Sequence, residues 1–269
     1  MHSDVVDLRD FYASSLGQMA CRMIRRRLRL LWPDLGGLGL LAIGYAVPYL
    51  RPFRDEAARV VAVMPALQGV LPWPADGPNL VALADEGELP FEDASVDRVL
   101  LVHAVESSEE VRALLKEVWR VLAGSGRVLV VVPNRRGIWA RLDRTPFGLG
   151  HPYTPAQLSR LLREELFTPV RSAGALFIPP VRRRVMLRAA PAWERLGERL
   201  FTRFAGGFGS GRGRSCARLR RGGRLREEQR LVGRCGRQRA ERGTQQRQQR
   251  CGKNSPGETR GWHRLQSFP

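Results

Sequence analysis

Apolar residues between positions 86 and 132 follow three successive patterns. A short run of mostly aliphatic residues covers 98–102, and a second run covers 127–132. Between them, apolar side chains recur at steps of three and four positions, as on one face of a helix: Val111, Leu114, Leu115, Val118, Val121 and Leu122. Gly124 and Gly126 follow, and glycine supplies the left-handed backbone that ends many helices. The order predicts strand, helix and strand, which is the crossover unit of a parallel sheet.

Similar patterns elsewhere predict the remaining elements. Apolar runs at 39–43, 59–63 and 79–84 predict three strands before this unit, and 170–178 predicts a sixth strand after it. One continuous amphipathic helix is predicted over 7–32, and another helix over 193–204. Thr154, Pro155 and Gln157 form the start signal of a further helix, because Thr is a good N-cap and Pro suits the first helical position.

The central segment resembles a known family. It contains Leu-Pro-Phe, a polar turn, an Asp before the strand and a Glu-x-x-Arg-Val-Leu helix, represented here by Leu89, Pro90, Phe91, Asp97, Glu117, Arg120, Val121, Leu122, Gly124 and Gly126. This combination over about 38–133 resembles class I S-adenosylmethionine-dependent methyltransferases of the type 11 group. The resemblance implies an α/β fold, a Rossmann-like sheet with helices on both faces. It also implies a seventh, antiparallel strand between the fifth and sixth. Since no apolar run after residue 204 can supply that strand, we predict that it is missing.

The loop after the first strand departs from the family pattern. Family members carry an acid and a glycine-rich loop here, which lets the backbone pass close to the cofactor. This chain keeps Gly44 but has Tyr45, Ala46 and Pro48 in the loop, and Ala42 where the acid would be. The resemblance implies that Gly44, Tyr45 and Ala46 line the cofactor site, S-adenosyl-L-methionine being the cofactor.

Two further strand ends are implied to contact the cofactor. Met64 stands where the family has an acid that accepts hydrogen bonds from the ribose, and its thioether accepts only weakly. Asp85 matches the acid near the adenine amino group, and the backbone N–H of Glu86 would donate to an adenine ring nitrogen. The alternative for Asp85 is an ordinary turn residue.

The end of the fourth predicted strand offers a candidate catalytic residue. His103 could act as a base toward the acceptor, or it could be a hydrogen-bonded wall residue. Glu106 lies at the same edge, or is a solvated helix start. By resemblance, the 134–150 loop covers the acceptor pocket, and Phe11 and Tyr12 help to form a lid over the cofactor.

Charge divides the chain into two parts. The net charge is +19, but residues 207–269 contain 17 Lys and Arg against 4 Asp and Glu. We predict a methyltransferase-like domain over 1–206 and a disordered Arg/Gly/Gln-rich tail over 207–269, because such a composition buries too little apolar surface to fold. The tail is either an arginine-rich RNA-binding segment or, as we prefer, a frameshift product. Nucleic acid is not expected to bind elsewhere.

Other sequence features exclude several classes of protein. The four cysteines match no zinc spacing, so no metal is expected. The N-terminus lacks the pattern of a signal peptide, and the longest weakly polar run, 38–50, is too short to span a membrane. We therefore expect a cytoplasmic protein without a membrane span.

The resemblance implies methyl transfer from S-adenosylmethionine to a small-molecule acceptor. The alternative is a non-catalytic methyltransferase-fold binding module that has lost cofactor affinity.

Overall fold

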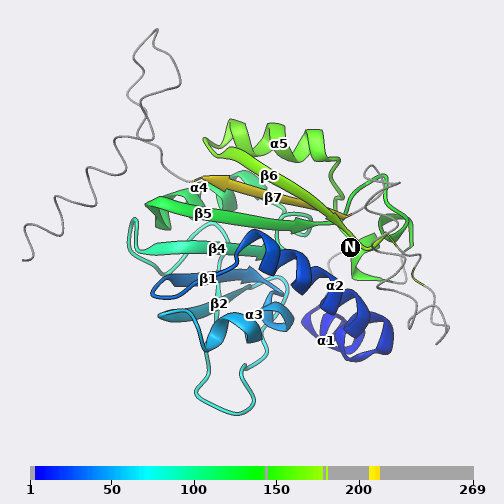
Figure 1. Ribbon diagram of the computed structural model, residues 1–269, viewed down its shortest axis with the longest axis horizontal. Coiled ribbons are helices and arrows are strands. Elements are labelled where there is room, and N and C mark those ends of the chain that lie inside the picture. Colours follow the sequence, from blue (N-terminus) through cyan, green and yellow to red (C-terminus); the bar gives the residue numbers. More distant parts are fainter. Residues whose placement is uncertain (1–3, 143–144, 178–179, 181–205, 213–269) are drawn as a thin grey trace, which may run out of the picture. The chain divides into compact units, whose positions relative to one another are not determined.

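The sheet at the centre of the chain determines where every candidate site residue lies. The computed structural model describes residues 4–142, 145–177 and 180, and the backbone of 206–212, all within one compact unit, Met1–Cys216. Its strands lie in the order β3-β2-β1-β4-β5-β7-β6 (Figure 1). Their bounds are β1 (Gly39–Gly44), β2 (Arg59–Pro65), β3 (Val81–Ala84), β4 (Val96–Val102), β5 (Leu122–Val132), β6 (Thr168–Ala175) and β7 (Gly206–Arg212). The first five strands are parallel, which confirms the predicted Rossmann-like α/β fold.

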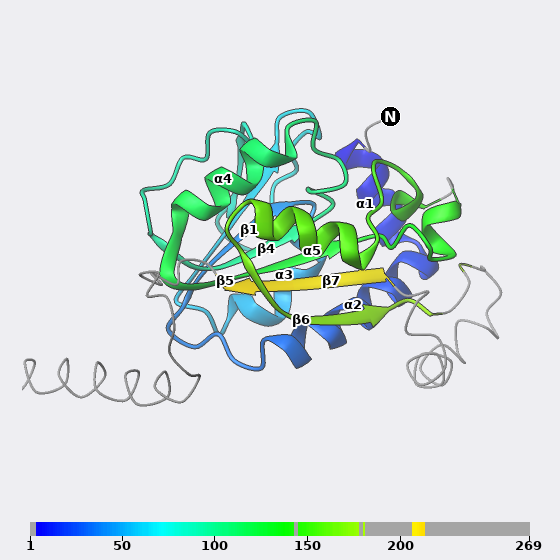
Figure 2. The same ribbon diagram turned by 90° about the horizontal axis from the view of Figure 1, so that it is seen from above.

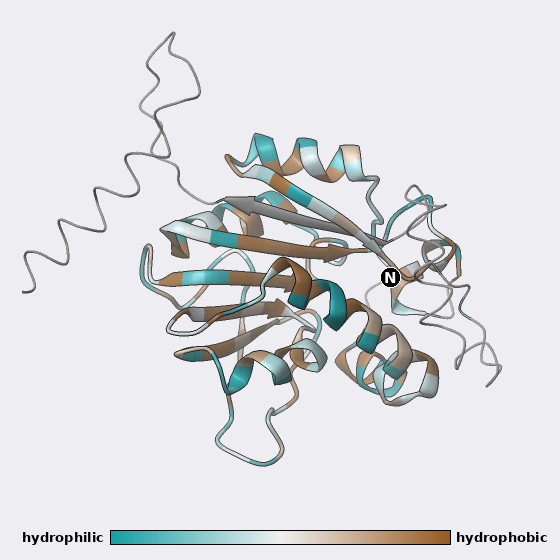
Figure 3. Cartoon of the chain, viewed as in Figure 1, coloured by the Kyte–Doolittle hydropathy of each residue, from teal (hydrophilic) through white to brown (hydrophobic). Residues whose placement is uncertain are grey.

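Helices cover both faces of this sheet. Figure 2 shows α4 (Val111–Val121) and α5 (Pro155–Glu164) on one face, and α2 (Ser15–Leu31) and α3 (Val47–Arg54) on the other. Successive residues of β1 belong to two separate apolar cores on opposite faces of the sheet. Leu41 and Ile43 pack on the α4 side, while Leu40 and Ala42 pack on the α2 side. Strands β1, β4 and β5 are accordingly mostly apolar (Figure 3) and contribute residues to both cores, as buried parallel strands require.

The predicted helix over 7–32 is interrupted. The structure has α1 (Val5–Ala13) and then α2, separated by Ser14 in an extended conformation. The Ser14 hydroxyl accepts a hydrogen bond from the Gly17 N–H and so caps α2. A Cβ on Gly17 would lie 2.0 Å from the Phe11 carbonyl oxygen, so this corner needs glycine. Apolar spacing alone did not show the break because both helices contribute to one core.

The predicted glycine stop after α4 is wrong in detail. Helix α4 ends when Leu122 becomes extended, and β5 begins at that same residue. Neither Gly124 nor Gly126 has a positive φ. Gly126 serves a steric purpose instead, because a Cβ there would lie 2.6 Å from Cγ of Leu122.

The seventh strand, predicted to be missing, is present as β7. It pairs antiparallel with β5 on one side and with β6 on the other. Its sequence is GGFGSGR, which has no run of branched apolar residues. The prediction failed because ladder pairing uses backbone N–H and C=O groups, which glycine also carries.

The predicted domain boundary after residue 206 falls inside β7, and the compact unit extends to Cys216. The predicted disorder and the frameshift origin of the tail concern mainly residues 213–269, which lie outside the described residues. The predicted helix over 193–204 also lies outside them. The capped helix predicted at Thr154 is confirmed as α5, where the Thr154 and Gln157 side chains form the expected capping box.

Arg120 on α4 holds the loop that follows β3. Its guanidinium donates to the carbonyl oxygens of Leu89 (2.9 Å) and Phe91 (2.8 Å) and to the carboxylates of Glu117 (2.7 Å) and Asp93 (2.8 Å). The Leu89 N–H in turn donates to Glu117 at 2.9 Å. The hydrogen bonds from Arg120 lower the pKa of Glu117. The Leu-Pro-Phe and Glu-x-x-Arg motifs are therefore two halves of one hydrogen-bonded junction.

Arg120→Ala should lower the free energy of unfolding by about 2 kcal/mol at pH 7, because it removes the donor to two carbonyls and leaves the partly buried Glu117 carboxylate with the Leu89 N–H but no cation. Glu117 has a lowered pKa in the folded protein, so its contribution is present above its unfolded pKa of about 4.3 and is lost as pH falls. The difference between wild type and variant should therefore narrow from pH 7 to pH 3 in urea denaturation. The exposed Lys116 on the same helix provides the control, Lys116→Ala, which should change stability by less than about 0.5 kcal/mol. If the difference in the free energy of unfolding between wild type and Arg120→Ala does not change with pH, the proposed contribution of the Arg120–Glu117 pair is wrong.

Candidate functional site

The carboxyl ends of β1 and β4 approach each other closely. Gly44 ends β1 with φ +82°, and a Cβ at this position would lie 2.2 Å from the Val102 carbonyl oxygen at the end of β4. The Ala46 N–H donates to the Gly44 carbonyl at 3.0 Å, and α3 begins directly afterwards with Pro48 in its first turn. Tyr45 and Ala46 are buried. The turn thus allows the chain to leave the sheet at the edge where ligands bind in parallel α/β folds.

The end of β2 is packed into the core. Met64 is fully buried, and its sulfur accepts a hydrogen bond from the Leu71 N–H at 3.4 Å. The loop after β2 then turns toward β4, where the buried Gln68 donates from Nε2 to the His103 carbonyl at 3.2 Å. The Gln68 carbonyl accepts from the Val5 N–H at 2.9 Å, which ties the start of α1 to this edge.

The end of β3 is open to solvent. Asp85 is exposed, and its Oδ1 accepts the Gly87 N–H at 2.8 Å. Glu86 is half-buried and accepts a hydrogen bond from the Ser108 hydroxyl at 2.5 Å. This contact joins the loop after β3 to the turn after β4. An acid at this edge is therefore accessible to a ligand.

His103 lies at the centre of a buried hydrogen-bonded chain. It follows β4 directly, with φ +52° and 2% exposure. Its Nδ1 is 3.0 Å from Oε1 of Glu106, and its Nε2 is 2.8 Å from the Tyr12 hydroxyl. The Tyr12 hydroxyl is also 2.7 Å from that of Tyr49. Glu106 is 1% exposed, so the interpretation of Glu106 as a solvated helix start is wrong.

Aromatic rings enclose this chain. The Tyr12 ring is stacked on Tyr45, with centroids 5.7 Å apart and planes 24° apart, and it meets Phe11 edge-on at 5.1 Å. Burial raises the pKa of both Tyr12 and Tyr49 well above the usual value of 10. Both phenols are therefore neutral hydrogen-bond donors at physiological pH.

Two buried acceptor atoms next to His103 have no hydrogen-bond partner within the described ranges: Oε1 of Gln68 and Oε2 of Glu106. Leaving such atoms unpaired in the interior costs free energy. A native structure that retains them often uses them for a ligand or a water molecule.

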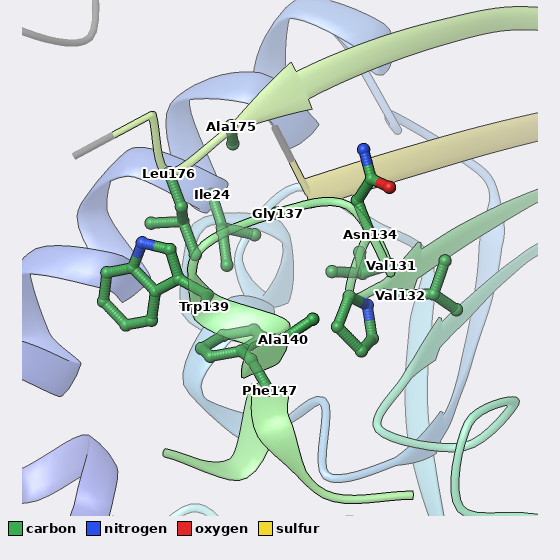
Figure 4. Close-up of a pocket in the computed structure, with 11 residues that line it drawn as sticks. Ile24, Val131, Val132, Asn134, Gly137, Trp139, Ala140, Phe147, Ala175 and Leu176 are labelled. Atoms are coloured by element: carbon green, nitrogen blue, oxygen red, sulfur yellow. The ribbon is translucent and has the colours of Figure 1, made fainter. Parts of the chain in front are cut away.

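An apolar pocket lies beside the hydrogen-bonded series of His103, Glu106, Tyr12 and Tyr49 (Figure 4). It lies between α2, the end of β5 and the end of β6, and its free volume is about 20 Å³. Its lining is Ile24, Val131, Val132, Pro133, Asn134, Gly137, Trp139, Ala140, Phe147, Ala175 and Leu176. Phe147 belongs to the short 3₁₀ helix η2 (Pro146–Gly148), and its ring also contacts the His103 ring, with centroids 5.1 Å apart. One ring thus separates the pocket from the hydrogen-bonded chain.

The structure brings some of the predicted site residues together. At one edge of the sheet lie Gly44, Tyr45, Ala46 and His103, and Tyr12 contacts both Tyr45 and His103. Met64, in contrast, points into the core. Asp85 and Glu86 lie in the loop after β3, linked to this edge through Ser108. Their individual roles toward a cofactor stay predictions.

Sequence reasoning missed the parts that Gln68 and Tyr49 play. No local pattern marks Gln68, and Tyr49 lies within an ordinary helical repeat. The resemblance predicts Tyr12 only as part of a lid. Its hydrogen bond to His103 depends on how α1 packs against the sheet, which no local pattern shows.

Part of the chain is similar to a known protein family. Residues 43–130 match the family model of a methyltransferase domain. This match spans 88 of the 269 residues, so the chain contains a segment that is similar to methyltransferase domains. Within the described ranges of this chain, no helix is long and apolar enough to cross a membrane, and no three His, Cys, Asp or Glu residues cluster as metal ligands.

The fold of this chain resembles solved structures at low sequence identity. A Thermotoga maritima S-adenosylmethionine-dependent methyltransferase, described as a possible histamine N-methyltransferase, has a TM-score of 0.57 and 16% identity, covering 78% of this chain and 95% of that one. A chain from a Haloferax volcanii complex of a methyltransferase activator with a putative methyltransferase has a TM-score of 0.54 and 17% identity, covering 77% and 97%. These likenesses establish the fold. No curated protein matches the chain.

Proposed function

We propose that this chain is an S-adenosylmethionine-dependent methyltransferase that acts on a small, largely apolar acceptor. The observation that carries the proposal is the carboxyl edge of the methyltransferase domain. There the glycine turn after β1, an exposed acid after β3 and a buried histidine after β4 occur on one sheet. S-adenosylmethionine, when bound, supplies an electrophilic methyl group carried on a sulfonium.

The residues at this edge fit such a cofactor, with one departure. Asp85 is exposed and ready to accept a hydrogen bond from an adenine amino group, with the Glu86 N–H beside it. The unpaired Oε1 of Gln68 is a buried acceptor suited to an ammonium or hydroxyl group. The departure is Met64, which offers no carboxylate to a ribose. We propose Asp85, Glu86 and Gln68 as the residues that hold the cofactor, beside the turn at Gly44.

The pocket of Figure 4 supports an apolar acceptor. Its walls come from aliphatic and aromatic side chains of α2, β5, β6 and the 134–150 loop, and Asn134 is the polar side chain among them. Pockets of this composition bind small molecules mainly through apolar contact, with a few polar groups that fix orientation. The Phe147 ring, which lines this pocket, contacts the ring of His103, and His103 is the proposed base.

The proposal is tested by titrating the full chain with S-adenosylhomocysteine in a calorimeter. We expect saturable binding in the micromolar range. Asp85→Ala should weaken the affinity about 10- to 100-fold, because it removes a charge-assisted hydrogen bond worth about 1.5–3 kcal/mol. The exposed Glu88 in the same loop provides the control, since Glu88→Ala should leave the affinity unchanged. Equal losses in both variants would contradict the role of Asp85.

A second candidate, a non-catalytic binding module, is favoured by a different observation. Tyr45 and Met64 are both buried, and Tyr12 is hydrogen-bonded inside the same edge. Tyr45 takes up space that glycine leaves free in the family pattern, and Met64 stands where that pattern has a carboxylate. If the titration gives no heat at millimolar S-adenosylhomocysteine, the module is the correct interpretation.

A further inference from the structure

Four polar side chains meet in the interior next to the proposed acceptor pocket. Tyr49 on α3, Tyr12 on α1, and His103 and Glu106 after β4 are joined by contacts of 2.7, 2.8 and 3.0 Å. Each is less than a tenth exposed. Burying so many polar groups costs free energy unless they are paired with one another. Here each group contacts the next, so the four side chains form one continuous hydrogen-bonded chain.

The chemistry of the groups sets the direction of the protons. With Glu106 as a carboxylate, its oxygens only accept, so Nδ1 of His103 carries the ring proton. Nε2 then has a free lone pair and accepts the proton of the Tyr12 hydroxyl. Tyr49 donates to the Tyr12 oxygen in turn. Every donor in the chain therefore points toward Glu106.

Tyr12 is the least buried member of this hydrogen-bonded series. It is 7% exposed, whereas His103, Glu106 and Tyr49 are 2%, 1% and 0% exposed. Its ring is held by Tyr45 and Phe11, so the hydroxyl has a defined position. Phe11 also contacts Phe147, which lines the apolar pocket, with centroids 6.0 Å apart.

Burial raises the pKa of Tyr12, so its hydroxyl keeps its proton and no phenolate is present to act as a base. A proton that arrives at its oxygen must be matched by a proton that leaves toward Nε2. His103 is suited to take it, because the buried Glu106 carboxylate stabilises the imidazolium that results.

We propose that Tyr12, His103 and Glu106 form a proton relay toward which the methyl acceptor presents an O–H or N–H group. This inference rests on the proposed function and adds the acceptor class to it. The acceptor's O–H or N–H bond breaks, and its electron pair forms the new bond to the methyl carbon, while the sulfonium sulfur keeps the pair of the broken C–S bond. The proton goes to the Tyr12 oxygen as the Tyr12 proton goes to Nε2. Tyr12 is the catalytic residue, and His103 and Glu106 act through it.

The first test is independent of any acceptor. Nitrogen-15 NMR of the histidine rings in the full chain should show His103 protonated at Nδ1 and bare at Nε2, assigned by loss of the signal in His103→Asn. Tyr12→Phe should shift the Nε2 resonance, because it removes the donated hydrogen bond and keeps the ring packing. If Nε2 carries the proton, His103 donates to Tyr12 and cannot receive from it, and the relay is overturned.

The second test measures turnover. Release of S-adenosylhomocysteine is followed with a panel of apolar phenols, carboxylic acids, amines and thiols. We expect turnover with an O–H or N–H compound, and a loss of about 100-fold or more in kcat for Tyr12→Phe and Glu106→Gln. Affinity for S-adenosylhomocysteine should stay within about twofold, which separates failure of the relay from failure of the proposed function. Lys116→Ala, at an exposed position on α4, should keep full kcat.

Three outcomes would overturn the relay in a protein that still binds S-adenosylhomocysteine. They are turnover of thiols alone, absence of turnover with every O–H and N–H compound, and an unchanged kcat in Tyr12→Phe.

Discussion

Gly44→Ala is expected to lower the free energy of unfolding by about 2–5 kcal/mol, or to prevent folding at 37 °C. Two causes add. The residue has φ +82°, a conformation that costs an L-residue with a side chain about 1–2 kcal/mol. The new Cβ would also lie 2.2 Å from the Val102 carbonyl oxygen, a backbone atom that moves only if β4 shifts, and such overpacking costs about 1–3 kcal/mol. Urea denaturation of the full chain, followed by circular dichroism, measures the loss.

Gly37→Ala provides a matched control for this prediction. Gly37 also has a positive φ, +72°, but nothing lies within 4 Å of a Cβ built on it. The control should therefore lose only the conformational part, about 1–2 kcal/mol. Equal losses in the two variants would mean that β1 and β4 do not approach each other as described, and that Gly44 is replaceable at the site.

Met64→Glu should lower the free energy of unfolding by about 3 kcal/mol or more, and it should not improve cofactor binding. A glutamate here restores the acid that the family pattern has at the end of the second strand. In this structure, however, Met64 is fully buried in the core on the α2 side, with its sulfur against the Leu71 N–H. A carboxylate placed there loses its hydration without gaining a cationic partner, which is among the most destabilising changes in a core.

Met64→Leu preserves volume and apolar character, so it should cost less than about 1.5 kcal/mol. The measurements are urea denaturation of both variants and titration of both with S-adenosylhomocysteine. A stable Met64→Glu variant that binds this ligand tenfold more tightly would show that position 64 lines the cofactor crevice and not the core.

Local patterns predicted most of the fold because each strand and helix contains its own signal. The runs at 39–43 and 98–102 became β1 and β4 within a few residues, since buried parallel strands are continuously apolar. The start of α5 at Thr154 was predictable because its cap is made within one turn. The interruption at Ser14 was not, because the apolar stripe continues on both sides of it.

The placement of part of the candidate site was also predictable. Gly44 and His103 follow parallel neighbouring strands, and the ends of such strands share one edge. Sequence reasoning could not show that Met64 is buried, since the same residue type suits a core position and a ligand wall equally well.

The sequence by itself determined a Rossmann-like sheet covered by helices, a methyltransferase motif and the edge at which a ligand would bind, because periodicity and motif spacing are local properties. Only the tertiary structure decided that β7 completes the sheet with glycine-rich backbone, and that Tyr12 and Tyr49 join His103 and Glu106 in one buried chain. Both depend on contacts between segments far apart in sequence. Backbone pairing and the docking of α1 leave no local pattern from which such contacts can be inferred.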